Sequence, residues 1–576
     1  MYETRPWLRF YGGVPETLDY PRLRLDEIVA RSADRFPDLV AYHFLGRTAT
    51  YAQLHEAIER CAAGLVAQGV RTGDRVTIAL PTSPQGVVAF YAVSRVGAVS
   101  SMIHPLSTPE EIAHYLSLSH SRLAITLDGL YDRFAEVRAN TPLETIVLTR
   151  ISDELPLVKR VGYWVTTTRK AQRIPASADV VWWSELVDGR SAPAAVPATG
   201  PEELGTIFYS SGTTGAPKGI MLSHAGVTSE ALEVAAWVSL DERDVLLAVL
   251  PIFHGFGLAA LVHAGLLSGA KLVLLPRFSP TTVAKVMRSE HPTLMAGVPT
   301  LYEALAHHPA LRRADLSMLR AAYSGADTLR PSVRGAFEQL VRERGGTVRL
   351  IEGYGLTEAV TAIMCNPLHR PRDGSIGIPF PDILAKICEP GTDHELEAGQ
   401  EGEICISGPP LMLGYLDNPE ATAKTLKQHA DGRTWLHTED IGSTDEEGYF
   451  TFACRRKRMI KSSGFNVYPA QVEAVLDEHP AVGASCVIGV PDEAQGERVK
   501  AFVIARDERA AGDQLAAELM AYCRSRLIKW SCPREIEFRS RLPLTRIGKI
   551  DYVALSREVE TPGAADASPA GLQTVR

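Results

Sequence analysis

The sequence predicts an α/β protein with a large amino-terminal domain of helix-covered sheets and a small mobile carboxyl-terminal α+β domain. Short runs rich in leucine and β-branched residues occur at 75–80, 123–126, 145–148 and 271–275, and helical stretches such as 51–68 separate them. This alternation indicates parallel sheets covered by helices. A chain of 576 residues also exceeds what one hydrophobic core usually serves, so we expect at least two domains.

The pattern changes after residue 453. A charged stretch is followed by a helix that opens at Pro469, by apolar strands at 484–490 and 499–505, and by a second helix. One face of that second helix carries Leu515, Leu519, Tyr522, Cys523 and Leu527 at helical spacing. We therefore predict a core at 1–454, a hinge at 455–458, a small mobile domain at 459–556 and a disordered tail at 557–576.

Composition excludes several classes of protein. A hydrophobic content of 45% with 22% charged residues is typical of a globular protein, and a net charge of −8 argues against a general nucleic-acid binder. The eight cysteines include no C-x-x-C pair, which fits neither a disulfide framework nor a zinc site. This use of cysteine favours a reducing cytoplasm. The amino terminus lacks the basic start and apolar run of a secretory signal, so we expect no cleavage there.

The stretch 246–268 contains no Asp, Glu, Lys or Arg and is long enough to span a membrane. Pro251, two histidines and several glycines interrupt it. We therefore predict a buried strand, turn and helix here rather than a membrane span.

The most informative segment reads YSSGTTGAPKGIMLSH over residues 209–224. Its glycines allow backbone amides to approach phosphate oxygens, its hydroxyls add donors, and Lys218 adds a mobile positive charge. The spacing of glycines and lysine does not fit the usual P-loop. The segment therefore predicts a triphosphate-binding loop, and an ordinary Gly/Ser-rich surface loop is the alternative.

With this loop the chain resembles the adenylate-forming superfamily of acyl-CoA synthetases, carrier-protein adenylation domains and beetle luciferases. Further matching segments follow in order: LPIFHG at 250–255, YSGA at 323–326, EGYGLTE at 352–358, GEICISGP at 402–409, WLHTED at 435–440, RRKRMIKSSGFNVYP at 455–469 and LPLTRIGKI at 542–550. The resemblance covers residues from about 20 to about 555.

The resemblance implies ATP, Mg²⁺ and CoA as ligands. The residues it assigns to nucleotide and CoA binding are Ser210, Ser211, Gly212, Thr213, Thr214, Gly215, Lys218, Gly325, Ala326, Glu352, Gly353, Tyr354, Gly355, Thr357, Asp440, Arg455, Lys461, Ser463 and Gly464. Thr214 and Glu358 are placed near Mg²⁺, because a hard cation bridging phosphates needs one carboxylate and few other protein ligands. Tyr354 would stack on adenine, and Glu352 would bond its amine.

The resemblance further assigns catalysis to Lys549, Thr214, Glu358 and His254, and the acid pocket to Trp237, His254, Phe256, Val298, Tyr323 and Gly355. Lys549 would bridge the α-phosphate and the attacking carboxylate in one pose of the small domain. Lys461, Ser463 and Gly464 would serve the second, thioester-forming pose, with Lys457 at the hinge. His254, Tyr354 and the other candidates each have an alternative as ordinary core or surface residues.

The chain departs from the family at one position. The usual Thr-Gly-Asp is Thr438-Glu439-Asp440 here, which adds a carboxylate beside the aspartate that would hold the ribose. Such a charge would weaken ATP binding if it pointed inward. We expect Glu439 to point away from the ribose.

The resemblance implies an ATP-dependent acyl-CoA synthetase that forms an acyl-adenylate and then a thioester with CoA. The segments 5–11 and 18–21 resemble medium- and long-chain fatty acyl members. Two alternatives stay open: a ligase that loads a free-standing acyl carrier protein, and a degenerate nucleotide-binding regulator. The basic, aromatic-containing stretch 155–178 further suggests transient contact with anionic lipid, with a solvated loop as the alternative.

Overall fold

The protein is described here by a computed structural model that covers residues 2–156, 159–160, 174–175, 177, 179–188, 199–210, 217–462, 465–492, 495–544 and 550–560. The chain divides into two compact units. Unit 1 comprises Met1–Lys386, Cys405–Thr438 and Asp445–Phe450, and unit 2 comprises Ile387–Ile404, Glu439–Thr444 and Thr451–Arg576. Each unit is described by itself.

The first sheet of unit 1 has the strand order β19-β9-β8-β4-β3-β5-β6-β7. Its strands are β3 (Arg75–Ala79), β4 (Val99–Met102), β5 (Leu123–Leu127), β6 (Thr145–Thr149), β7 (Val180–Trp182), β8 (Leu204–Tyr209), β9 (Gly219–Ser223) and β19 (Gly414–Tyr415). In this order, the six neighbouring strands β8, β4, β3, β5, β6 and β7 are parallel to one another. Strand β9 pairs with β8 in antiparallel fashion, and β19 pairs with β9 in the same way. The runs predicted at 75–80, 123–126 and 145–148 are confirmed as strands.

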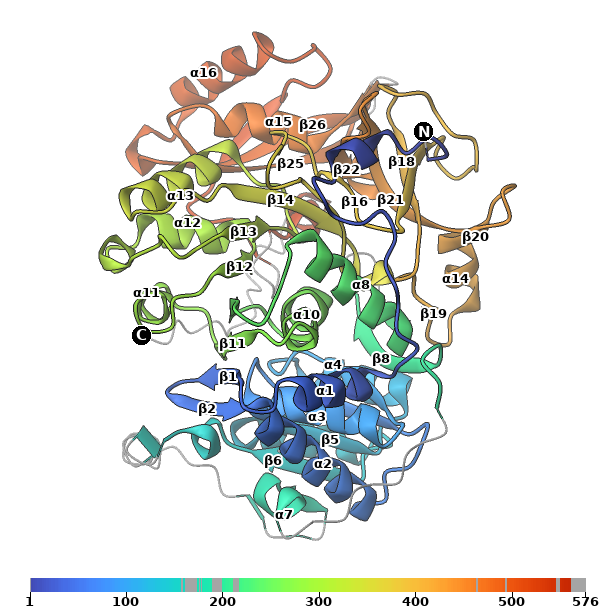
Figure 1. The fold of residues 1–576 in the computed structure, drawn as a ribbon. Helices are drawn as coiled ribbons and strands as arrows, with labels where there is room; N and C mark the ends of the chain where they lie inside the picture. Colours follow the sequence, from blue (N-terminus) through green and yellow to red (C-terminus); the bar gives the residue numbers. More distant parts are fainter. Residues whose placement is uncertain are drawn as a thin grey trace. The chain divides into compact units, whose positions relative to one another are not determined.

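Helices cover this sheet. They are α1 (Leu25–Arg35), α2 (Tyr51–Ala67), α3 (Pro84–Arg95), α4 (Pro109–Ser119), α5 (Tyr131–Arg138) and α7 (Trp183–Val187). Figure 1 shows α1, α2 and α3 side by side, and α3 packs against β3 and β4. The sequence sets where two of these helices begin, because Thr50 and Thr108 form capping boxes with the third residues of α2 and α4.

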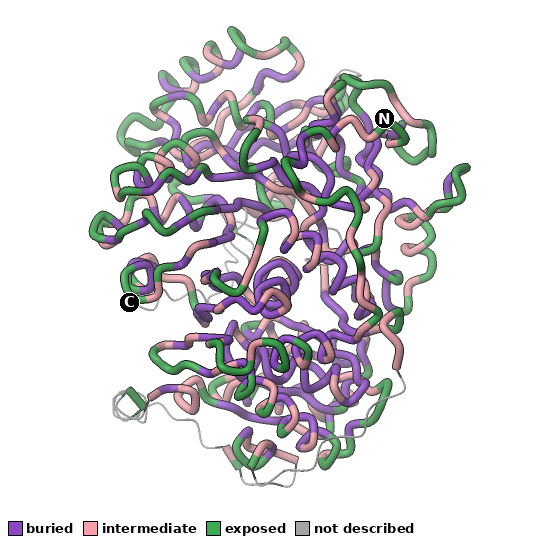
Figure 2. Tube along the Cα trace, in the orientation of Figure 1, coloured by how far each residue is buried: buried purple, intermediate pink, exposed green. Residues whose placement is uncertain are grey.

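The second sheet of unit 1 has the order β16-β15-β14-β13-β12-β10-β11-β1-β2. Its strands are β1 (Val40–Phe44), β2 (Arg47–Thr50), β10 (Val245–Ala248), β11 (Lys271–Leu274), β12 (Leu294–Gly297), β13 (Ala321–Ser324), β14 (Leu350–Gly355), β15 (Ala362–Cys365) and β16 (Ile378–Pro379). One core cluster joins its central strands to α11 (Pro280–Ser289), α12 (Pro299–His307) and α13 (Pro331–Glu343). Figure 2 shows these strands buried and the outer side of these helices exposed.

The uncharged stretch 246–268 forms β10, a turn and a continuous helical segment made of α9 (Gly255–Gly257), the π-helix η5 (Leu258–His263) and α10 (Ala264–Leu267). The helical segment packs against α8 (His224–Trp237). The predicted strand, turn and helix are therefore confirmed. In the described part of the chain, every helix is too short or too polar to cross a membrane.

A third sheet contains β17 (Leu384–Cys388), β18 (Gly402–Ser407), β20 (Leu426–Gln428), β21 (Thr434–Thr444) and β22 (Phe450–Arg455), and α14 (Pro419–Thr425) precedes β20. Unit 2 also holds β23 (Ile460–Ser462), β24 (Phe465–Val467), β25 (Val482–Asp492), β26 (Gly496–Ala505), β27 (Glu535–Phe538), α15 (Pro469–Asp477), α16 (Asp513–Arg524) and α17 (Tyr552–Glu560). As predicted, a helix opens at Pro469, and Leu515, Leu519 and Cys523 face the core from the second helix. The α/β class is confirmed.

Candidate functional site

The predicted phosphate loop connects β8 and β9, which pair through Tyr209 and Gly219 at its base. The amide of Ser210 donates to the carbonyl of Lys218 at 3.0 Å, and the amide of Lys218 donates to Oγ of Ser210 at 3.1 Å. These two bonds hold the ends of the loop together. The residues between them that were predicted to grip phosphate, Ser211, Gly212, Thr213, Thr214 and Gly215, lie outside the described residues.

Tyr415 joins the loop lysine to the predicted metal carboxylate. The ammonium of Lys218 lies 4.4 Å from the centre of the Tyr415 ring, and the Tyr415 hydroxyl donates to Oε1 of Glu358 at 2.8 Å. Pairing of β19 with β9 brings Tyr415 to this position from far along the chain. Sequence reasoning missed Tyr415, because nothing in its own neighbourhood reveals a tertiary pairing with the loop strand.

The predicted nucleotide segments lie on adjacent parallel strands. Ser324 of β13 is in register with Glu352 of β14, so Gly325 and Ala326 follow β13 beside the stretch 352–355. Ala326 adopts a left-handed conformation with φ 70°. Both segments therefore meet at the carboxyl ends of parallel strands, where α/β proteins commonly bind ligands.

The carboxyl group of Glu352 is bonded to residues of unit 1. Its Oε1 accepts from the amide of Leu329 at 3.0 Å, and Arg334 lies 3.5 Å from Oε2. Burial raises the pKa of Glu352 to about 7. The carboxyl group thus already binds Leu329 and Arg334, and it lies next to the stretch predicted to contact adenine.

Gly355 marks a very close backbone approach. A Cβ atom at this position would fall far inside van der Waals contact with the carbonyl oxygen of Thr361. Between them the chain turns through Val360, whose φ of 64° is unusual for a β-branched residue. The turn that carries Thr357 and Glu358 is therefore fixed by contact at its two ends.

The predicted acid-pocket residues fall into two groups. The ring of Phe256 lies beside Gly325, at 3.4 Å from where a Cβ atom on that glycine would be. His254 caps α9, because its Nδ1 accepts from the amide of Phe256 at 3.4 Å. Tyr323 and Gly355 lie on β13 and β14. Trp237 ends α8 and packs against Tyr11 and Phe380, whereas Val298 packs against the core cluster of α11 to α13.

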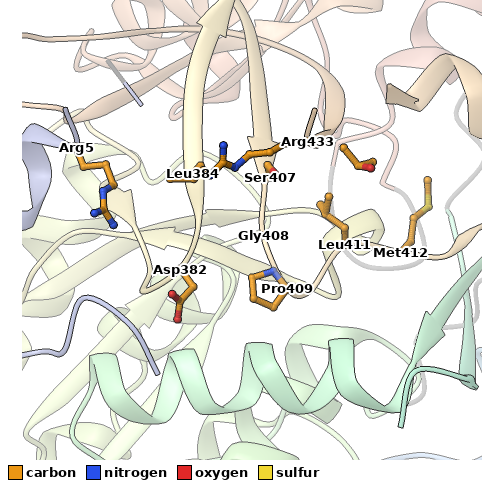
Figure 3. A pocket seen from close by; sticks show the side chains of 10 residues that line it. Arg5, Asp382, Leu384, Ser407, Gly408, Pro409, Leu411, Met412 and Arg433 are labelled. Carbon is orange, nitrogen blue, oxygen red and sulfur yellow. The ribbon is translucent and has the colours of Figure 1, made fainter. Parts of the chain in front are cut away.

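A pocket of about 600 Å³ lies elsewhere in unit 1 (Figure 3). It is lined by Arg5, Asp382, Leu384, Ser407, Gly408, Pro409, Leu411, Met412, Arg433 and Thr434. None of the predicted site residues that the structure describes lines it. Met412, which lines the pocket, also touches the site, because its amide donates to the carbonyl of Glu358 at 2.8 Å.

In unit 2, Asp440 and Glu439 have opposite environments. Asp440 is fully buried, and its Oδ1 lies 3.1 Å from Nε of Arg455. Glu439 is half exposed, and its Oε2 lies 2.9 Å from Nζ of Lys457. Glu439 also has φ 57°, a left-handed conformation that glycine adopts without strain. The extra carboxylate therefore pairs with Lys457 rather than lying beside Asp440 and Arg455.

Other predicted residues are placed only in part. Lys461 is exposed on β23, and its amide donates to Oε2 of Glu497 at 2.6 Å. Ser463, Gly464 and Lys549 lie outside the described residues, as does most of the proposed lipid-contact stretch. Of that stretch, Lys159 donates to the carbonyl of Leu45 at 2.6 Å and Arg160 donates to the carbonyl of Asp153 at 2.7 Å.

Comparison with known proteins decides the family. The family model described as "AMP-binding enzyme" matches residues 29–416, and "AMP-binding enzyme C-terminal domain" matches residues 471–549. The chain belongs to the AMP-binding enzyme family. The resemblance inferred from the sequence is thereby confirmed.

Individual relatives of this AMP-binding enzyme extend over nearly its whole length. A long-chain-fatty-acid–CoA ligase of Bacillus subtilis (strain 168) is 36% identical over 557 residues, 96% of this chain and 97% of the relative. A feruloyl-CoA synthase of Amycolatopsis sp. is 34% identical over 526 residues, 90% of this chain and 96% of the relative. The crystal structure of anthranilate CoA ligase AuaEII in complex with anthranoyl-AMP superposes with a TM-score of 0.82 at 26% identity, covering 94% of this chain and 98% of that one.

Two substitutions at Tyr415 should separate its two contacts in this AMP-binding enzyme. Tyr415→Phe keeps the ring under Lys218 but removes the bond to Glu358, and a bond to a charged group contributes roughly 1.5–3 kcal/mol. We expect the ATP and Mg²⁺ concentrations for half-maximal pyrophosphate exchange to rise roughly tenfold. Tyr415→Leu should raise them further. Equal values for Tyr415→Phe and the unmodified enzyme would contradict a role for the hydroxyl.

Two neighbouring substitutions should have contrasting effects on ATP use. Asp440→Ala removes a buried partner of Arg455, and we expect the ATP requirement to rise by about one to two orders of magnitude. Glu439→Gly should leave ATP use unchanged and stabilise the fold by about 1 kcal/mol, because left-handed strain is relieved while an exposed ion pair contributes little. Exchange kinetics and thermal unfolding measure both. A marked improvement of ATP use in Glu439→Gly would instead identify Glu439 as an impairment.

Proposed function

We propose that this AMP-binding enzyme is an ATP-dependent acyl-CoA synthetase that activates a carboxylic acid. The carboxylate attacks the α-phosphorus of ATP, pyrophosphate leaves, and the thiol of CoA then attacks the acyl-adenylate carbonyl and releases AMP. The observation that carries the proposal is the arrangement of Lys218, Tyr415 and Glu358 at the base of the phosphate loop. Adenylation brings two anions together, so the site must supply positive charge and aligned donors.

We assign phosphate binding to the loop from Ser210 to Lys218. The bonds between these two residues fix where the loop leaves and re-enters the sheet. Contact with the Tyr415 ring limits where the Lys218 ammonium can lie, which reduces the conformational freedom it loses on binding phosphate.

The described residues fit a magnesium ion at Glu358. This residue offers a half-buried carboxylate oriented by Tyr415, and Mg²⁺ bound with phosphates needs only one or two carboxylates. We assign Glu358, together with Thr214, to hold it. The bound ion would neutralise charge on the phosphates.

We assign the adenine to Tyr354, Gly325 and Ala326, on the edge formed by the ends of β13 and β14. Glu352 would contribute there while its carboxyl group holds Leu329. In unit 2 we assign the ribose hydroxyls to Asp440, which Arg455 orients. The acid would lie near His254 and Phe256.

The remaining assignments follow the family pattern. We propose a core at 1–454, a hinge at 455–458 around Lys457, a small mobile domain at 459–556 and a tail at 557–576. Lys549 would act in adenylation, and Lys461 with Ser463 and Gly464 would act in thioester formation. We place the enzyme in the cytoplasm, since all eight cysteines are free thiols. Transient contact of the stretch 155–178 with anionic lipid stays a prediction.

The test is pyrophosphate exchange with a panel of fatty, aryl and substituted acids, followed by thioester formation with CoA. We expect exchange with at least one acid class and CoA-dependent release of AMP. Exchange without a CoA thioester would favour an acyl carrier protein as acceptor. Binding of AMP without exchange for any acid would favour a nucleotide-binding regulator.

A further inference from the structure

Unit 1 contains a pocket of about 600 Å³ that the proposed function does not use (Figure 3). Small-molecule sites usually have volumes of roughly 300–1,000 Å³, so this pocket is large enough for a ligand of its own. Its lining combines two arginines with leucine, proline and methionine side chains. The charges, the backbone and the shape of this lining indicate what it binds.

Among the described residues, the two guanidinium groups that line the pocket lack a close carboxylate partner. No acidic side chain of the described chain lies within ion-pair distance of the Arg5 guanidinium. The acidic partner of Arg433 is Asp431, whose Oδ2 lies 4.0 Å from its Nη1. That oxygen also accepts from Nε1 of Trp435 at 3.1 Å. Both arginines can therefore pair with an anion from outside the chain.

Asp382 is the one acid among the described lining residues, and protein donors already bind it. Its Oδ2 accepts from the amide of Leu18 at 2.8 Å and from the Tyr20 hydroxyl at 2.8 Å. These bonds join the amino-terminal segment to the wall of the pocket. Since one carboxylate engaged in this way is set against two guanidinium groups, the lining favours a negatively charged ligand.

Two of the lining residues have a left-handed backbone conformation. Arg5 has φ 43°, and Asp382 has φ 60°. Residues other than glycine seldom adopt this region, and such positions concentrate at functional sites. Packing holds Arg5 in place, because Trp7, two residues later, is fully buried and packs against the ring of Phe450. The fold therefore keeps a strained arginine at the pocket.

The pocket is charged at one end and apolar at the other. Figure 3 shows Arg5 at one end, Leu411 and Met412 at the other, and Arg433 between them. Leu384 adds to the apolar part of the lining. A ligand that matches both ends has an anionic head and an apolar chain.

We infer that this pocket binds an amphiphile with one anionic head group, a carboxylate or a phosphate, and an apolar chain. Arg5 and Arg433 would hold the head, because guanidinium groups pair with both anions through two parallel hydrogen bonds. The chain would lie along Leu411 and Met412, where contact with these side chains removes it from water. The inference does not rest on the proposed function, since the described residues assigned to ATP and to the acid lie outside the pocket.

The experiment uses dodecanoate with a photoreactive diazirine near the end of its chain, added to the full-length enzyme without ATP or CoA. Illumination couples the chain to the residues that it contacts, and mass spectrometry of the digested protein locates the label. We expect saturable labelling of the peptide that contains Leu411 and Met412. Labelling confined to other segments, such as the proposed acid site near Phe256, would overturn the inference.

Competition with unlabelled compounds tests the charge of the head group. Dodecanoate and dodecyl phosphate should suppress labelling of this peptide, and the more effective of the two identifies the preferred head. Dodecanol has the same chain without a charge, so we expect it to be at least about tenfold less effective. Equal competition by dodecanol would contradict recognition of an anion.

Variants locate the head and the chain. Arg5→Gln and Arg433→Gln should each raise the concentration for half-maximal labelling by about tenfold or more. Arg31→Gln replaces an exposed arginine of α1 in the same unit and should change nothing. Unchanged labelling in both pocket variants would contradict the inference.

Ser407→Phe tests the pocket without removing a charge. Ser407 lines the pocket at the end of β18, so a phenyl ring there should fill part of the space and reduce labelling. Thermal unfolding shows whether each variant is folded. Normal labelling of a folded Ser407→Phe protein would place the bound chain elsewhere and would also overturn the inference. Since no step uses ATP, the result is independent of whether the enzyme catalyses pyrophosphate exchange.

Discussion

Replacing Lys549 by alanine should reduce pyrophosphate exchange by about 10²–10³ while leaving thioester formation from preformed acyl-adenylate largely intact. In the proposed mechanism its ammonium offsets repulsion between the carboxylate and the α-phosphate as charge shifts in the transition state. Loss of one preorganised donor typically has an effect of this size. The second half-reaction uses the other pose of the small domain, so it does not need this lysine.

The two half-reactions are measured separately, with ATP–pyrophosphate exchange for the first and CoA-dependent consumption of synthetic acyl-adenylate for the second. Lys457→Pro provides the complementary variant, because Lys457 lies in the 3₁₀ turn Arg456–Arg458 at the proposed hinge. A ring-locked φ should restrict the hinge and impair the second reaction more than the first. Equal loss of both reactions in Lys549→Ala would refute the division of roles and indicate general destabilisation.

Replacing Gly355 by alanine should reduce adenylation by about 10². The added methyl group would overlap the carbonyl oxygen of Thr361, a backbone atom that cannot rotate away. The turn between these residues must then shift, and with it Thr357 and Glu358. A displacement of about 1 Å in positioning groups has an effect of this size on rate.

Gly335→Ala is the matched control for this change. Gly335 lies within α13, and a Cβ atom there would meet nothing within 4 Å. Alanine should stabilise that helix by about 1 kcal/mol and leave exchange unchanged. Thermal unfolding of both variants separates loss of activity from loss of fold. Full adenylation activity in Gly355→Ala would show that the turn tolerates movement, contrary to the close contact with Thr361.

Glu439 stands where the family usually has glycine, and the effect of this change becomes clear only from the tertiary structure. The sequence identifies the change from glycine and raises the question of impaired ATP binding. The structure supplies the left-handed φ that explains why glycine suits this position, and it places the carboxylate on Lys457. Neither fact can be read from the sequence, because backbone dihedrals and side-chain pairing are set by the folded chain.

The sequence by itself determined the fold class, the family and the identity of the candidate loop, because these depend on local patterns. Hydrophobic periodicity set the strands around 75–80 and 145–148, and capping residues set helix starts. Only the tertiary structure revealed Tyr415 between Lys218 and Glu358, and the full burial of two helical glutamates, Glu230 and Glu233, inside unit 1. The physical reason is that burial and contact arise between segments far apart in the chain. A glutamate in a helix has the same letter whether it faces water, where it is ionised, or a core, where desolvation keeps its proton on.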